Sequence, residues 1–159
     1  MAEDKARVVE PNREQTRLVM MDLEGLLPLD HQARGIWALV EGLDLSDFLE
    51  RIRAREGSAG RPAIDPRILL GLWIMATSDG VGSAREIERL CAHHLAYQWM
   101  CGGVNVNHHT LSDFRNLSAD QLSQVLTDTT ATLLASGLVE MQRVAQDGVR
   151  VRASAGASS

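Results

Sequence analysis

Hydrophobic and polar positions alternate with a helical period over most of the chain. Apolar residues recur every three or four positions from residue 31 to 52 and from residue 118 to 136. Residues 68–76 are apolar at almost every position, which predicts a central helix that is buried on all sides. The predicted helices cover 31–41, 45–52, 66–78, 83–92, 95–100, 110–116 and 118–136. The expected fold class is therefore mainly α, with at least five helices.

Polar residues at the predicted helix starts fit the side chains that cap helices. Asp30 and Asp44 precede the first two helices, and Asp65 followed by Pro66 precedes the central one. Ser83 and Ser118 are each followed three residues later by Glu or Gln, which predicts two capping boxes. Gly42 and Gly137 are expected to end the helices that precede them.

The β-type residues that stand apart from this helical pattern lie after residue 138. Val144, Val149 and Val151 surround the pair Asp147 and Gly148. One interpretation is a two-strand hairpin that turns at Asp147 and Gly148, and the residues alone favour it. The other is a carboxylate held on a strand to bind a divalent cation such as Mg²⁺. We expect at most two short strands, both in this segment.

Composition places the chain among globular proteins. The 159 residues suit one domain, or one domain and a fragment of a second, and 45% of them are hydrophobic. The N-terminus is charged and lacks the apolar run of a signal peptide, and no apolar run is long enough to cross a membrane. We therefore expect a cytoplasmic protein. Its two cysteines do not make a disulfide framework.

The net charge of −5 argues against nucleic acid, but its distribution argues less strongly. Bases outnumber acids in two segments, 51–67 and 143–159. Such basic segments allow contact with phosphates, although a solvated charged surface is their commoner meaning.

Two further constellations have a structural and a functional interpretation. Six zinc-type ligands lie close together in sequence without the usual zinc spacing: Cys91, His93, His94, Cys101, His108 and His109. Residues 66–78 and 83–92, joined by a glycine turn, have the outline of a helix-turn-helix, but most helical proteins contain such pairs.

The polar stretch from Asn107 to Arg115 leads from a loop into a short helix. Its side chains include donors suited to phosphates or base edges, namely His109, Thr110, Ser112 and Arg115. The alternative is that Asn107 or Thr110 only caps a structural helix, and for this stretch alone that alternative is favoured.

Eight motifs in order resemble the amino-terminal part of bacterial insertion-sequence transposases of the DDE class. They include Leu26-Leu-Pro-Leu-Asp-His31, Gly80-Val-Gly-Ser-Ala-Arg-Glu-Ile87, His108-His-Thr-Leu-Ser-Asp-Phe-Arg115 and Asp147-Gly-Val-Arg-Val-Arg-Ala153. The resemblance implies three regions: a disordered arm over 1–21, a helical DNA-binding domain over 22–138, and over 139–159 the first strands of a ribonuclease-H-like catalytic domain.

The resemblance also implies a function and a set of site residues. The helical region would bind the terminal inverted repeats of an insertion element, and Asp147 would be the first of three acids that hold Mg²⁺. The candidate DNA-binding residues are Arg51, Arg53, Arg55, Arg61, Arg67, Arg85, His108, His109, Thr110, Ser112 and Arg115.

The second and third acids of the triad do not follow Asp147, so this chain is expected to be catalytically incomplete and to hold no metal tightly. Its partners would be DNA and another transposase copy, either itself or a full-length one. Two alternatives stay open: a stand-alone DNA-end-binding regulator or inhibitor of full-length transposase, and a helical protein-interaction module.

Overall fold

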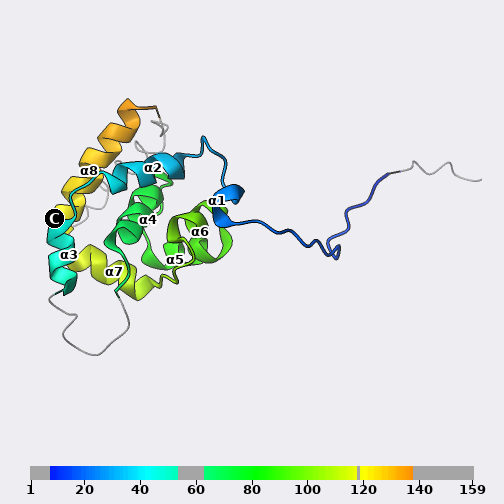
Figure 1. The fold of residues 1–159 in the computed structure, drawn as a ribbon, viewed down its shortest axis with the longest axis horizontal. Coiled ribbons are helices and arrows are strands. Elements are labelled where there is room, and N and C mark those ends of the chain that lie inside the picture. The colour runs from blue at the N-terminus through cyan, green and yellow to red at the C-terminus, as the bar shows by residue number, and fades with distance from the viewer. Residues whose placement is uncertain (1–7, 54–62, 118, 138–159) are drawn as a thin grey trace, which may run out of the picture.

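A computed structural model describes residues 8–53, 63–117 and 119–137, and Figure 1 shows their arrangement. Within these ranges the chain forms eight helices and no strand. The helices are α1 (Leu23–Leu26), α2 (Gln32–Glu41), α3 (Ser46–Arg53), α4 (Pro66–Ser78), α5 (Ala84–His93), α6 (Leu95–Cys101), α7 (His108–Leu117) and α8 (Ala119–Ala135). The mainly α fold is confirmed. The predicted strands around Asp147 lie outside the described residues.

Helix α4 is the centre of the fold, as the apolar run predicts. It begins as expected, because a carboxylate oxygen of Asp65 accepts a hydrogen bond from the amide of Arg67 and Pro66 occupies the first turn. Every residue from Ile68 to Ala76 is buried. Helices α2, α6 and α8 pack around α4, so it contacts three neighbours at once (Figure 1).

The pairing of α4 and α5 as a helix-turn-helix is not confirmed. The main contacts of α4 are with α2, α6 and α8, whereas those of α5 are with α6 and α7. Gly80, at φ +73°, turns the chain between the two helices. This turn carries α5 away from α4 and onto the helices that follow it in sequence.

Two of the predicted caps are wrong. The cap of α2 is His31 and not Asp30, because Nδ1 of His31 accepts a hydrogen bond from the amide of Ala33. Asp30 lies inside a turn that is closed by a hydrogen bond from the His31 amide to the Pro28 carbonyl. Ser83 precedes α5 but its side chain makes no capping hydrogen bond. Asp44 does accept from the amide of Ser46, as predicted.

Helix α7 begins two residues earlier than predicted. The Asn107 side-chain oxygen accepts from the amide and the hydroxyl of Thr110, at 2.9 and 3.0 Å. Helix α8 buries Leu122, Thr129 and Leu133, and Gly137 follows its end at φ +73°, as predicted for a helix stop.

The short helix α1 is fixed by a polar cluster. The carboxylate of Glu24 accepts from the guanidinium of Arg34 and, at 3.0 Å, from the indole nitrogen of Trp99. The Arg34 guanidinium lies 5.2 Å from the centre of the Trp99 ring. Residues of α1, α2 and α6 are thereby joined.

Residues 8–22 form an extended segment, here called the arm, which runs away from the helices in Figure 1. Six large hydrophobic side chains of the arm are exposed: Val8, Val9, Leu18, Val19, Met20 and Met21. The boundary of the helical domain near residue 22 remains a prediction. No helix within the described ranges is long and apolar enough to cross a membrane.

Candidate nucleic-acid interface

Two of the candidate arginines lie together where α5 begins. Arg115, on α7, donates from Nη1 to the carbonyl of Gly82 at 3.1 Å. Gly82 lies two residues before the first residue of α5, Ala84, and Arg85 is in the first turn of that helix. This contact places Arg115 beside the start of α5, the helix whose first turn carries Arg85, although the two arginines are thirty positions apart in the sequence.

A second contact joins the middle of α5 to the start of α7. The Nδ1 atom of His108 lies 2.7 Å from a carboxylate oxygen of Glu88. Since Arg115 meets the start of α5 and His108 meets a residue one turn further along it, the two helices run antiparallel. The candidate residues of α7 are therefore spread along α5.

The candidate residues of α7 differ in how far they are already engaged. Thr110 is bound to Asn107, as the capping interpretation predicts, and His108 is bound to Glu88. His109 is exposed, and its ring lies 4.1 Å from that of His108. Ser112 is half-buried. Of these four residues, His108, His109, Thr110 and Ser112, only His109 is exposed.

Arg85 and Arg89 occupy the same exposed face of α5 but differ in pairing. Arg89 donates to the carboxylate of Glu86 at 2.5 and 3.0 Å, which raises the pKa of the arginine and lowers that of the glutamate. Within the described residues Arg85 makes no hydrogen bond or ion pair. Its charge is the more available of the two for an external anion.

The arginines of the basic segment fall into three groups. Arg51 and Arg53 lie in the last turn of α3, which is held beside α7 by the stacked rings of Phe48 and Phe114, 5.6 Å apart. Arg67 is hydrogen-bonded to Asp65 at the start of α4. It lies about 16 Å along the helix axis from Ser78, the residue after which the chain turns towards α5. The remaining two, Arg55 and Arg61, lie outside the described residues.

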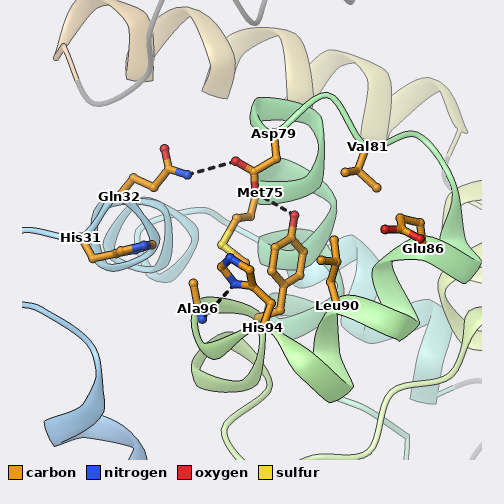
Figure 2. A pocket seen from close by; sticks show the side chains of 10 residues that line it. His31, Gln32, Met75, Asp79, Val81, Glu86, Leu90, His94 and Ala96 are labelled. Carbon is orange, nitrogen blue, oxygen red and sulfur yellow. Dashed lines mark hydrogen bonds between the residues drawn. The ribbon is translucent and has the colours of Figure 1, made fainter. Parts of the chain in front are cut away.

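A polar pocket of about 440 Å³ lies between α2, α4, α5 and α6 (Figure 2). Asp79, at the end of α4, accepts from Gln32 at 3.2 Å and from the hydroxyl of Tyr97 at 2.9 Å. Asp79 and Glu86 line this pocket, and among the described residues no lysine or arginine does. Its charge disfavours phosphate, so the pocket is not part of the candidate interface.

Sequence reasoning missed the residues that position the candidates. Trp73, Gly82 and Glu88 hold Arg115 and His108 in place, and each comes from another part of the chain. No motif marks such contacts, because they depend on how the helices pack. The one feature of the sequence that indicated a change of chain direction here is the pair of glycines in the turn at 80–82.

The metal-site hypotheses receive no support from the described residues. No three His, Cys, Asp or Glu side chains of these ranges converge on a position for a metal ion. The Cys and His residues of the zinc interpretation, all of which are described, do not form such a group. Asp147, the candidate Mg²⁺ ligand, lies outside the described residues.

Comparison with known proteins identifies the family. The family described as a transposase domain (DUF772) matches residues 21–117, which is more than half of the chain. No curated protein and no solved structure matches the chain. The matched range includes helices α1 to α7 and therefore every described contact between α5 and α7. The chain belongs to the transposase domain (DUF772) family, and its function is related to transposition.

Proposed function

We propose that the helical region is a DNA-binding domain that recognises the terminal inverted repeats of an insertion element. The observation that carries the proposal is the match of residues 21–117 to a transposase domain. A transposase must hold the ends of its element, and helices that expose cations are a common means of doing so.

The junction of α5 and α7 is the surface that supports DNA contact best. Arg85 and Arg115 are both exposed there, and phosphate contacts need unpaired or partly paired cations. The Ser83 side chain does not cap α5, so the first-turn amides of this ten-residue helix remain available to an oxygen atom. Helix α3 packs beside α7 through Phe48 and Phe114, and the last turn of α3 carries Arg51 and Arg53.

The roles within this surface follow from how firmly each side chain is held. Arg115 is fixed by Gly82 and by the ring of Trp73, so we assign it to a phosphate and not to a base edge. His109 is exposed and Ser112 is half-buried, and neither side chain makes a hydrogen bond within the described structure. We assign base contacts to these two residues.

Salt-dependent DNA binding by matched variants tests the proposal. Duplexes that the purified chain selects from a random pool are compared with shuffled duplexes, by fluorescence anisotropy at several salt concentrations. Arg85→Ala should weaken binding to both kinds of duplex and lower the slope of log K against log salt by about one. Arg89→Ala is the control, since Glu86 already neutralises that side chain, and it should have the smaller effect.

Two results would contradict the proposal. One is the absence of any preference for the selected duplexes at every salt concentration. The other is an equal effect of Arg85→Ala and Arg89→Ala, which would remove the start of α5 from the interface.

One observation favours a protein-interaction module instead. The arm exposes Leu18 and Met20 almost fully, at 96% and 95%, and adjacent exposed hydrophobic residues mark protein contacts. This alternative predicts self-association that is lost when residues 1–21 are deleted, with no salt-sensitive DNA binding. Light scattering combined with the anisotropy measurements separates the two.

A further inference from the structure

The two cysteines of the chain come together in the fold. Cys91 lies in the last turn of α5 and Cys101 is the last residue of α6. The two helices pack against each other, both cysteines line the same pocket, and the two thiols are close enough to affect each other's pKa. Both cysteines are free thiols. The sequence contains no others, so any intramolecular disulfide of this chain must join these two.

A pocket gives small molecules access to both sulfur atoms. It has a volume of about 550 Å³, and Cys91 and Cys101 line it together with Glu88 and Gln98. Cys101 is otherwise buried, with 4% of its surface exposed, and Cys91 is half-buried. A small oxidant can therefore reach the thiol pair through the pocket, while a large one is hindered.

The neighbouring thiols have different acidities. The hydrogen bond from Cys91 stabilises the thiolate of Cys101 and holds the pKa of Cys101 below its ordinary value. The pKa of Cys91 is raised by the same interaction and by burial. Because the thiolate is the nucleophile in thiol chemistry, Cys101 would react first and Cys91 second.

We propose that Cys91 and Cys101 form a reversible intramolecular disulfide when a small hydroperoxide enters this pocket. The Cys101 thiolate attacks the peroxide, the O–O bond breaks, and a sulfenic acid forms while hydroxide or alkoxide leaves. The Cys91 sulfur then attacks the Cys101 sulfur, the S–O bond breaks, and water leaves with the Cys91 proton. Two electrons pass from the two thiols to the peroxide, and a dithiol reductant returns them.

The covalent bond would join two helices that already pack against each other. Disulfide sulfurs are about 2.05 Å apart, so the bond requires the two thiols, which share one pocket between packed helices, to close by a shift of α6 against α5. The bond would fix the end of α5, one turn beyond Glu88, which is the partner of His108 on α7. The oxidation is independent of the proposed DNA binding and is measured without DNA.

Peroxide treatment of the dilute full chain tests the site. Both free thiols should disappear, peptide mapping should find Cys91 linked to Cys101, and dithiothreitol should restore both thiols. Peptide mapping is needed because exposed methionines such as Met20 and Met21 also gain oxygen. In Cys91→Ala the remaining Cys101 should be trapped as a sulfenic acid, which dimedone labels. In Cys101→Ala the remaining Cys91 should react much more slowly.

Circular dichroism of each variant checks that the helices are retained. If Cys101→Ala loses its helices, the peptide map of the oxidised wild-type chain and the dimedone labelling of Cys91→Ala still test the proposal. The proposal is overturned if wild-type chains link only to one another. It is also overturned if both thiols survive an amount of peroxide that oxidises Met20, or if they pass to higher oxides without a linked peptide.

Discussion

The guanidinium of Arg115 lies 5.0 Å from the centre of the Trp73 ring. The same indole donates from Nε1 to the backbone carbonyl of Leu111 at 3.2 Å, in a buried position. Trp73 of α4 therefore contacts α7 at two residues that are one turn apart. This pairing fixes the rotation of α7 on the central helix and hence the direction in which Arg115 projects.

Replacing Arg115 separates its structural role from its role towards DNA. Arg115→Ala should lower the free energy of unfolding by about 1 kcal/mol, since it removes an exposed cation–π interaction and one hydrogen bond. Arg115→Lys keeps the charge but not the planar group, so it should reduce stability and retain most DNA affinity. Urea unfolding and anisotropy measure the two effects. A loss of sequence preference without a loss of stability would contradict the phosphate role and assign Arg115 to base readout instead.

The stacked rings of Phe48 and Phe114 should be coupled energetically. A double-mutant cycle with Phe48→Leu and Phe114→Leu should give a coupling of about 0.5–1.5 kcal/mol in urea unfolding. Leucine keeps most of the buried volume, so the helices should persist. Additive effects of the two substitutions would mean that α3 is not held on α7 by this pair.

Gly71 marks the close approach of α4 and α6. A Cβ atom at this position would lie 2.7 Å from the Sδ atom of Met100, which is itself buried. Overpacking should outweigh the gain in helix propensity, so Gly71→Ala should destabilise the protein by about 1 kcal/mol. In a Met100→Ala background the same change should be stabilising. Thermal unfolding of the four proteins tests the reversal.

Tyr97 should resist ionisation in alkali. Burial and the nearby charge of Asp79 disfavour the phenolate and raise the pKa of Tyr97. The unfolded chain releases this proton near pH 10, so the stability that the hydroxyl contributes is complete below that pH and falls as pH rises above it. The chain has one tyrosine, so ultraviolet difference absorbance reports this residue alone. We expect no phenolate signal until the helices unfold, with Tyr97→Phe as the blank.

The basic segment should contribute to affinity and not to specificity. Joint replacement of Arg51, Arg53 and Arg55 by Ala should weaken binding to all duplexes and reduce the salt slope by about one for each arginine that touches a phosphate. Replacing His109 should instead reduce the preference for selected over shuffled duplexes. Equal effects of both changes on both kinds of duplex would exclude base readout by α7.

The periodicity of apolar residues was sufficient to predict the helices, because helical spacing and burial are local properties. The run 68–76 identified the buried central helix, and Asp65 and Pro66 identified its start. Local signals were also enough for the face of α8 and its stop at Gly137. Asp30 and His31 were both able to cap α2, and the geometry of the preceding turn decides which of them does so. The amino-acid sequence does not reveal that geometry.

The tertiary structure decided which helices meet and therefore where the candidate site lies. The α4 and α5 pair is consecutive in sequence, yet α5 packs on α6 and α7, because the chain turns at Gly80 and the apolar surfaces of the later helices are complementary to α5. The contacts of Arg115 with Trp73, of His108 with Glu88 and of Cys91 with Cys101 all join different helices. The sequence determined the helices and the family, and packing determined the surface, since long-range contacts leave no periodic signal in the chain.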